Sequence, residues 1–389
     1  MTGPSSPRDI IVHVFGRTDV GRTREHNEDC FVVADLTTMN ATLQPEVREH
    51  RPGNRGTLFM VADGMGGAAA GEVASQMATE VVIEELDAWW RRSESTDGDT
   101  FATSLRRAVE AANARIHRYA VEHPENRGMG TTTTVAGILG GTLYLCQVGD
   151  SRGYLVRDGV AKQITKDQSL VQRLIDAGEL TPEEAEVSER RNIILQALGP
   201  EAQVRVDLTT QPLRRGDILV LCSDGMSGQM RTPDISRIVS EKAPDLVETC
   251  KALIDLANEN GGPDNITVIT ARFEGEGLQP PAGNSDVGYQ PYVSPAEQRA
   301  TMPVDAATIE QSLMEASLVT TAETEIPAIP NGIAANDASP GGVRATTPIA
   351  PPPVVVPPRR LSVAQLRVIF GGLTVLVGVW LAWVYLLRD

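Results

Sequence analysis

The chain has 389 residues and a formal net charge of −16, from 51 acidic and 35 basic side chains. Its length allows two domains, or one large domain with appendages, and its apolar fraction of 41% can supply a core. The negative charge argues against a nucleic-acid-binding protein, which needs a basic surface, and is compatible with the clustered carboxylates that a hard metal ion requires.

The cysteines and histidines form no recognisable site. The four cysteines are far apart, with no C-x-x-C pair, so we expect neither a disulfide framework nor a zinc site. This usage favours a reducing compartment. No pair among the five histidines has the spacing of a zinc hydrolase motif.

Residues 9–275 alternate short apolar runs with turn residues and are predicted to form a folded domain. Runs rich in β-branched and aromatic residues predict strands at residues 11–14, 30–34, 57–62, 132–139, 142–148, 153–157, 204–208, 218–222 and 266–272. Apolar residues at helical spacing predict helices at residues 71–90, 101–121, 168–177 and 246–258.

Two dipeptides in this domain are typical of hairpin turns. Gly140-Gly141 and Asp158-Gly159 each separate two predicted strands. Hairpin-linked strands with few helices between them favour antiparallel sheets packed under helices over parallel βαβ winding. The pattern therefore predicts an α+β sandwich.

Residues 276–360 have the composition of a linker. Of the 25 prolines in the chain, 14 lie between Pro280 and Pro358, a stretch with eight acidic and two basic residues. Such a segment buries too little apolar surface to offset its conformational entropy, so we expect it to be disordered. Within it, the Ile326–Pro330 run resembles a short PxxP segment, and a passive spacer is the favoured interpretation.

Residues 368–387 carry no charge and are predicted to form a transmembrane helix. At about 1.5 Å per residue, 20 residues span the hydrocarbon core of a bilayer. Three arginines precede this segment, and the positive-inside rule then places the linker side in the cytoplasm. We expect a single-pass tail anchor in the cell (inner) membrane. The alternative is a buried core helix.

Acidic residues stand at the ends of five predicted strands. Asp63, Asp150 and Asp224 each follow an apolar run, whereas Asp264 and the Glu28-Asp29 pair precede one. If these strands are neighbours, the carboxylates converge and repel one another strongly, so a cation must neutralise them. Mg²⁺ and Mn²⁺ prefer oxygen ligands of this kind, and two such ions can activate water against a phosphoester.

Each acidic motif taken singly has a less specific interpretation. A single Asp-Gly is usually a turn, and a single Asn-Glu-Asp is usually a solvated loop. The glycine-rich run after Asp63 lacks the spacing of a nucleotide-binding loop. The joint occurrence of the motifs, in order, is what indicates a metal site.

The motifs together resemble the metal-dependent protein serine/threonine phosphatases of the type 2C (PPM) family, in its bacterial branch. The resemblance covers about residues 12–273. It rests on Arg24-x-x-Asn27-Glu28-Asp29, Asp63-Gly64-Met65-Gly66-Gly67, Gly130-Thr131-Thr132, Val148-Gly149-Asp150-Ser151-Arg152, Ser223-Asp224-Gly225 and Asp264-Asn265-Ile266-Thr267, all in the order of the family.

The resemblance implies an α-β-β-α fold, in which a central antiparallel β-sandwich is flanked by helix pairs, and a centre of two Mn²⁺ or Mg²⁺ ions with a third, weaker site. The reaction implied is attack on phosphoserine or phosphothreonine by a water or hydroxide that bridges the ions. By motif, the resemblance implies that Arg24 binds the phosphate and that Asp63 bridges the ions and is catalytic. The further metal ligands implied are Glu28, Gly64, Asp224 and Asp264, and Asp150 would serve the third ion. Asp29 and Asn265 would lie behind the ligands.

At two places the sequence fits the family pattern less closely. Some family members have a histidine, proposed as the general acid, where this chain has Met65, which cannot donate a proton. Residues 166–191 would form a mobile flap beside the site, although a purely structural helical hairpin fits this charge-rich stretch equally well.

The leading hypothesis is a phosphatase that acts on phosphorylated proteins, opposes a Ser/Thr kinase and binds no nucleic acid. A catalytically inactive scaffold is disfavoured, because it has no need for buried charge repulsion. A metal-dependent nuclease or small phosphoester hydrolase is also open, but the acidic net charge weighs against polynucleotide substrates.

Overall fold

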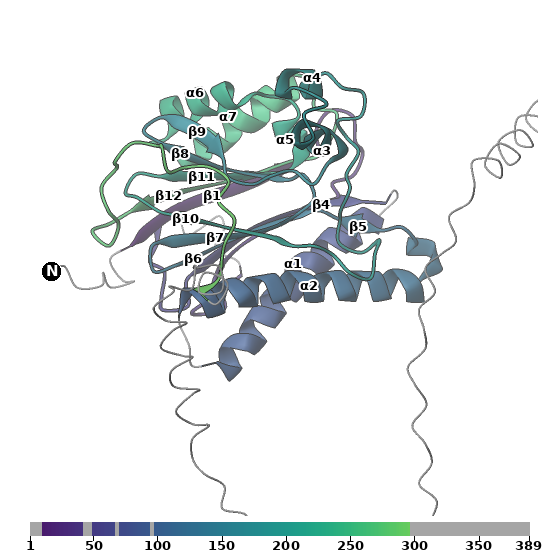
Figure 1. Ribbon diagram of the computed structural model, residues 1–389, viewed down its shortest axis with the longest axis horizontal. Helices are drawn as coiled ribbons and strands as arrows, with labels where there is room; N and C mark the ends of the chain where they lie inside the picture. Colours follow the sequence, from purple (N-terminus) through teal and green to yellow (C-terminus); the bar gives the residue numbers. More distant parts are fainter. Residues whose placement is uncertain (1–9, 42–48, 67–69, 94–96, 296–389) are drawn as a thin grey trace, which may run out of the picture. The chain divides into compact units, whose positions relative to one another are not determined.

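The computed structural model describes residues 10–41, 49–66, 70–93 and 97–295. They form two antiparallel sheets packed face to face, with helices on both outer faces (Figure 1). This arrangement confirms the predicted α+β sandwich.

The first sheet has the order β3-β1-β12-β11-β8-β9. Its strands are β1 (Ile11–Asp19), β3 (Glu49–His50), β8 (Arg152–Arg157), β9 (Val160–Gln163), β11 (Ile218–Cys222) and β12 (Ile266–Glu274). The outer face of this sheet is covered by α6 (Thr232–Lys242) and α7 (Leu246–Glu259), whose apolar residues pack with those of β8, β11 and β12.

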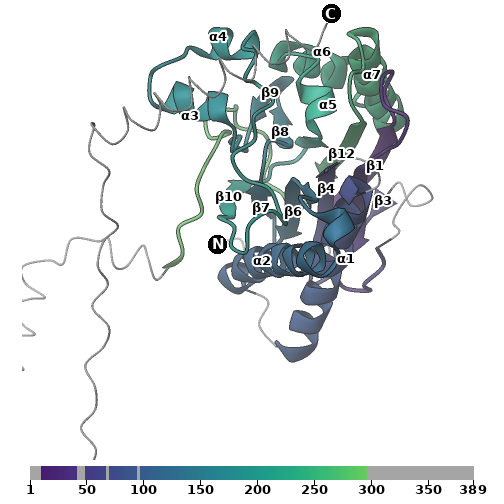
Figure 2. The same cartoon turned by 90° about the vertical axis from the view of Figure 1, so that its right-hand side faces the viewer.

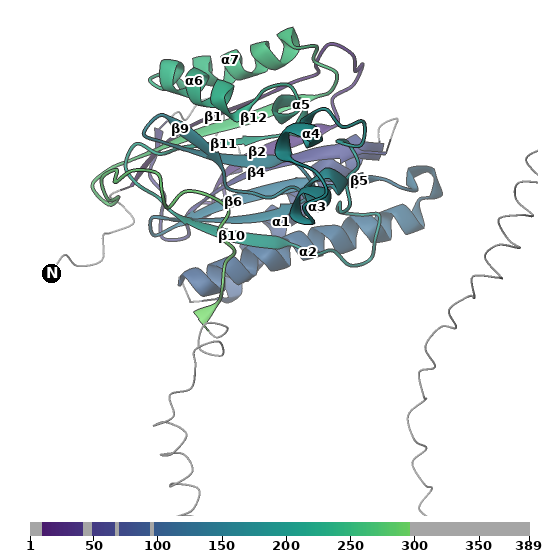
Figure 3. The same cartoon turned by 45° about the horizontal axis from the view of Figure 1, so that its top comes forward.

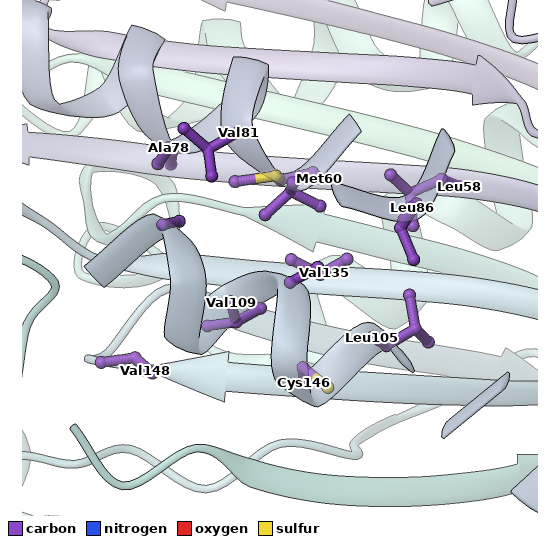
Figure 4. Close-up of a cluster of buried hydrophobic side chains, with 14 of the residues drawn as sticks. Leu58, Met60, Ala78, Val81, Leu86, Leu105, Val109, Val135, Cys146 and Val148 are labelled. Atoms are coloured by element: carbon purple, nitrogen blue, oxygen red, sulfur yellow. The ribbon is translucent and has the colours of Figure 1, made fainter. Parts of the chain in front are cut away.

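The second sheet has the order β10-β7-β6-β4-β2, with β5 paired to β4. Its strands are β2 (Asp29–Asp35), β4 (Thr57–Met65), β5 (Gly130–Thr131), β6 (Thr133–Leu139), β7 (Thr142–Val148) and β10 (Asp207–Pro212). Helices α1 (Ala70–Arg92) and α2 (Gly98–Glu122) cover its outer face, and Figure 4 shows their side chains meeting those of β4, β6 and β7.

Strand β4 is apolar on both faces because it lies between a helix layer and a sheet. Leu58 and Met60 belong to the cluster beneath α1 and α2, whereas Phe59 and Val61 belong to the cluster between the two sheets. Successive side chains of a strand point to opposite faces. This alternation directs Asp63, two residues after Val61, toward the space between the sheets.

Both predicted hairpin turns are confirmed by their backbone angles. Gly140 and Gly141 have φ values of 57° and 81°, and Asp158 and Gly159 have 52° and 75°. Two consecutive positive φ values are the mark of the type I′ turn, whose twist matches that of the flanking strands.

Several observed elements are absent from the predicted set, among them the short strands β3, β5 and β9. The strand expected at 204–208 begins instead at Asp207, because Val204 and Val206 pack against the cluster beneath α1 and α2 before the pairing with β7 starts. Helix α6 has no predicted counterpart either, although Pro233 stands in its first turn and Ile235, Ile238 and Val239 have helical spacing.

Ordered structure continues past β12, into residues that the sequence analysis assigned to the linker. Leu278 and Val287 are buried in the cluster between the sheets, and Thr209 of β10 forms a bridge with Pro291. These few apolar anchors hold a proline-rich segment that its composition alone predicts to be disordered.

The rest of the predicted linker and the predicted transmembrane segment at 368–387 lie outside the described residues. Contacts divide the chain into two units, residues 1–305 and 306–389, and the second lies wholly outside the described part. Within that part, every helix is too short or too polar to traverse a bilayer.

A buried ion pair fixes the segment after β12 to the sandwich. The side chains of Arg157 and Asp217 are each 1% exposed and meet through two hydrogen bonds, Nε to Oδ1 at 2.8 Å and Nη2 to Oδ2 at 2.7 Å. Asp286, beyond β12, accepts from Nη1 of Arg157 at 2.8 Å and from Arg214 at 3.2 Å. Two carboxylates therefore compensate one buried guanidinium.

We predict that Asp217→Asn lowers the free energy of unfolding of the full chain by about 3 kcal/mol, because it removes one partner of a buried pair and leaves the guanidinium under-compensated. Urea unfolding followed by circular dichroism measures this loss. The matched control is Asp255→Asn, whose pair with Lys251 is about half exposed and should contribute less than about 1 kcal/mol. Equal losses in the two variants would contradict the prediction.

Candidate active site

Six of the residues singled out in the sequence line one pocket of about 540 Å³. The pocket lies at the end of the sandwich where β4, α5 (Asp224–Ser227) and the first turn of α1 meet, the end that Figure 2 views. The predicted residues that line it are Arg24, Glu28, Asp63, Gly64, Asp224 and Asp264. Segments 240 residues apart in sequence thus converge as the motifs predicted.

Strand register brings Asp29 and Asp63 together. They are direct partners in the β2–β4 pairing, and Phe31 and Val61, each two residues away, point into the cluster between the sheets. Asp29 therefore shares the inward face with Asp63. From the opposite sheet, the Thr267 hydroxyl donates to Oδ2 of Asp29 at 2.6 Å. The space between the sheets thus changes from apolar to acidic at this end.

Asn265 holds the loop that presents Arg24 and Glu28. Its side-chain amide donates to the carbonyl oxygens of Val20 at 3.0 Å and His26 at 2.9 Å, and its Oδ1 accepts from the Glu28 backbone N–H at 2.8 Å. This side chain, 3% exposed, is therefore a buried clamp on the loop at residues 20–28.

Asp264 is paired with the cation of the pocket. Nη2 of Arg24 donates to Oδ2 of Asp264 at 2.8 Å, and the Asn265 N–H donates to the other oxygen at 2.9 Å. The Arg24 side chain remains about half exposed. Four of its five donor N–H groups are therefore left for another anion at the pocket mouth.

Two glycines allow backbone and carboxylate to approach closely beneath the pocket. A Cβ on Gly64 would stand 2.3 Å from the Gly71 carbonyl oxygen, and a Cβ on Gly71 would stand 2.9 Å from the carboxyl carbon of Glu28. No other residue type fits at either position. The Glu28 carboxylate consequently lies against the first turn of α1, where the helix dipole favours a negative charge.

The carboxyl groups at this end of the sandwich are difficult to ionise together. Burial, with the nearby charge of Asp224, raises the pKa of Asp29 and of Asp150 to about 7. Burial and the charges of Asp29 and Asp224 raise the pKa of Asp63 well above its usual range. Burial and the charge of Asp264 likewise raise the pKa of Asp224.

Asp150 belongs to the same electrostatic cluster but is not among the residues that line the pocket. It is 7% exposed, and its Oδ1 has no hydrogen-bond partner among the described residues. Oδ1 of Asp29 is buried and unpartnered in the same way. Orphaned carboxylate oxygens are costly inside a protein, so both are suited to a cation or an ordered water.

The donor set fits hard divalent cations that retain water. Among the described residues, no three carboxylate, imidazole or thiol groups form a ready-made cage. Mg²⁺ and Mn²⁺ need only one or two carboxylates each and complete their octahedra with water and carbonyl oxygens. Oxygen donors without histidine or cysteine, beside a roomy pocket, meet that requirement.

One wall of the pocket is formed by residues that the sequence motifs do not indicate. Asn192, Ile193 and Ile194 line it, just past the flap predicted at residues 166–191. The flap contains α3 (Leu170–Asp176) and α4 (Pro182–Glu186). The chain that enters the flap pairs with the chain that leaves it. The N–H of Leu170 donates to the Ile193 carbonyl, and the N–H of Leu195 donates to the Gln168 carbonyl. The signal was the apolar Ile193-Ile194-Leu195 run after a charged stretch.

The chain is similar in sequence to known phosphatases. The family described as Protein phosphatase 2C matches residues 48–266. The serine/threonine phosphatase stp of Listeria monocytogenes is 38% identical over 258 residues, which cover 66% of this chain and 94% of that protein. The serine/threonine protein phosphatase PstP of Mycobacterium tuberculosis is 38% identical over 262 residues, which cover 67% of this chain and 45% of PstP.

The fold is similar to solved structures of the same enzymes. A crystal structure of Mycobacterium tuberculosis PstP/Ppp matches with a TM-score of 0.57 and 38% identity, covering 68% of this chain and 99% of that one. A second structure, the catalytic domain of PstP in complex with two manganese ions, matches with a TM-score of 0.55 and 37% identity over 68% and 99% of the two chains.

The raised pKa values predict how the stability of the metal-free protein depends on pH. Asp29 and Asp150 ionise near pH 3.8 when exposed and near pH 7 when folded. The stability contributed by their neutral forms is therefore complete below about pH 4 and is lost as the pH rises through about 7. In EDTA we expect a lower melting temperature at pH 8 than at pH 6, and saturating Mn²⁺ should raise the pH 8 value.

Variants identify the groups responsible for this pH dependence. Asp150→Asn keeps the shape of the side chain without its charge, so this variant should lose less stability between pH 6 and pH 8 than the unaltered protein. The control, Asp255→Asn at an exposed position, should behave like the unaltered protein. If the melting temperatures of all three proteins fell equally, these carboxyl groups would not be the cause.

Proposed function

The chain belongs to the protein phosphatase 2C family of metal-dependent protein serine/threonine phosphatases, and we propose from that membership which of its residues perform each step. The observation that carries the assignment is the single pocket that contains Arg24, Glu28, Asp63, Asp224 and Asp264. The enzyme uses Mn²⁺ or Mg²⁺, and its acidic pocket fits ions of that kind.

In this proposal Asp63 would serve both ions. Asp224 and Asp264 would hold one ion, and Glu28 with the Gly64 carbonyl would hold the other. When bound, the ions act as Lewis acids that activate a water and polarise the phosphoryl group. Asp29 and Asn265 act behind these ligands: Asn265 fixes the Glu28 loop, and Asp29 faces Asp63 across the β2–β4 pair. Asp150 would help hold a third, weaker ion.

Arg24 is proposed to bind the substrate phosphate. Its planar guanidinium presents several donors to two phosphate oxygens at once, and its position at the pocket rim suits a phosphate carried by a protein chain. The hydrogen bond from Nη2 to Asp264 fixes the orientation of the fork. Burial alone would lower the pKa of Arg24, but charge pairing with Asp264, Glu28 and Asp63 outweighs it and raises the pKa, so the fork stays cationic.

Met65 lines the pocket but cannot serve as a general acid. A thioether has no proton to give. We propose that solvent in this open pocket protonates the departing serine or threonine oxygen.

The substrates are proposed to be phosphoserine and phosphothreonine residues of proteins that a Ser/Thr kinase has modified. The scaffold alternative is weakened by six buried or partly buried carboxyl groups, because a binding surface gains nothing from charges that destabilise the fold. They are Glu28, Asp29, Asp63, Asp150, Asp224 and Asp264. The nuclease alternative lacks support because, among the described residues that line the pocket, Arg24 is the single cation.

We further propose that residues 368–387 anchor the enzyme in the cell membrane, with the catalytic domain in the cytoplasm. The support is the uncharged 20-residue run itself, together with the arginines that precede it. A linker of the composition found at residues 296–360 would give the domain a wide reach from the membrane.

We predict Mn²⁺-dependent hydrolysis of p-nitrophenyl phosphate and of phosphothreonine peptides, abolished by EDTA. Asp224→Asn should lower kcat at least about 100-fold, as does removal of one preorganised electrostatic group from other active sites, whereas Asp255→Asn should leave the rate unchanged. Steady-state kinetics across a Mn²⁺ titration measure both effects. Equal rates in metal-free buffer would defeat the assignment.

A fractionation experiment tests the anchor. The full chain is expected to sediment with membranes and to need detergent, rather than high salt, for release, because about 20 apolar residues bind a bilayer almost irreversibly. A version that ends at Arg360 should stay in the supernatant. Recovery of both proteins in the supernatant would contradict the proposal.

A further inference from the structure

Residues 276–292 form a segment that we call the strap. It follows β12 and lies beyond the residues that the family match covers. Figure 3 shows the strap passing β10 and reaching the first turns of α2. It is therefore an addition to the sandwich, placed at the edge of the second sheet.

The strap pairs with the edge strand β10 through its backbone. The N–H of Thr210 donates to the Gln290 carbonyl at 3.0 Å, and the N–H of Tyr292 donates to the Leu208 carbonyl at 2.8 Å. The amide of Gln211 adds a bond to the Gly288 carbonyl at 2.7 Å. With Asp286 fixed by Arg157 and Arg214, the strap is held at both ends of β10.

Tyr289 connects the strap to the base of the flap. Its hydroxyl donates to Oδ2 of Asp207 at 3.3 Å, and the ammonium of Lys166, the first residue of the predicted flap, lies 5.8 Å from the centre of its ring. Lys166 also pairs with Asp176 at the end of α3, at 2.8 Å. A single side chain of the strap thus contacts both the flap and the strand beside it.

A chain of hydrogen bonds continues from this contact to the pocket wall. Arg205 pairs with Asp207 at 3.3 Å, and its carbonyl accepts from the side-chain amide of Gln168 at 3.2 Å. The Gln168 carbonyl in turn accepts from the Leu195 N–H at 2.8 Å. Leu195 directly follows Ile194, which lines the pocket.

We propose that Tyr289 is a positioning residue, which fixes the base of the flap and thereby the Asn192–Ile194 wall of the pocket. This proposal rests on the proposed phosphatase function. A small phosphoester occupies the pocket alone, whereas a phosphorylated protein must also lie against the wall and the rim. Val187, Ile193 and Leu195 are exposed there and offer apolar contact to the residues that flank a phosphorylated side chain.

The test compares two tyrosines of the strap in the full chain. Tyr289→Leu removes the ring beneath Lys166, while Tyr292→Leu removes a tyrosine that packs on Tyr144 and bonds to Asp99, away from the flap. Loss of an exposed cation–π contact changes affinity by about 2–5-fold. Tyr289→Leu should raise the KM for a phosphothreonine peptide by that factor and change the hydrolysis of p-nitrophenyl phosphate by less than about twofold.

Further measurements separate positioning from simple stability. Hydrogen exchange over residues 166–195 should speed up in Tyr289→Leu and stay unchanged in Tyr292→Leu. Tyr289→Phe, which keeps the ring beneath Lys166 but loses the bond to Asp207, should restore part of the loss in peptide KM. Lys166→Met should reproduce the effect, and the double variant should add little to it.

Two results would overturn the proposal. One is an unchanged peptide KM and unchanged exchange in a folded Tyr289→Leu protein. The other is an equal loss of activity on both substrates that parallels the melting temperature, which would make Tyr289 a structural residue only. If the unaltered enzyme hydrolysed neither substrate, the proposed function itself would fail, and that outcome is distinct from both.

Discussion

The active site is built on the burial of like charges at one end of an apolar core. Asp29, Asp63 and Asp224 lie where the space between the sheets ends, and two carboxylates about 4 Å apart repel by several kcal/mol even at an effective dielectric constant near 20. Burial in the first place, and this repulsion in addition, raise the pKa values of these groups. Protons or divalent cations must relieve this repulsion. Protons do so by neutralising the carboxylates, whereas divalent cations leave them charged for catalysis.

The rigidity that this arrangement needs comes from the two sheets. Phe59 and Val61 precede Asp63 on a strand that is apolar on both faces, and Leu219 and Leu221 precede Asp224 on the opposite sheet. Each carboxylate therefore stands at the end of a strand that cannot slip in register without exposing its core residues. The positions of the acids are consequently fixed by hydrophobic burial far from the pocket.

Alternation along the strands made part of this site predictable. An apolar run followed by aspartate and glycine occurs at Asp63 and at Asp224, and the family motifs indicated the other acidic residues of the pocket. Strand order is not encoded in any local pattern, so the direct pairing of Asp29 with Asp63 became visible only in the structure. The clamp by Asn265 was equally hidden, because its three partners are backbone groups about 240 residues away.

The strap shows where composition misleads. Proline content and sparse apolar residues predict disorder from residue 276 onward, yet Leu278, Val287 and the ion pairs of Asp286 hold the first part against the sandwich. Average composition cannot report a few well-placed anchors, because a segment that adds to an existing core needs far less apolar surface than one that folds alone.

Such a segment can differ between enzymes with the same metal centre. The carboxylates on rigid strand ends would then determine the chemistry, and the flap with the strap at its base would determine which phosphoprotein is accepted.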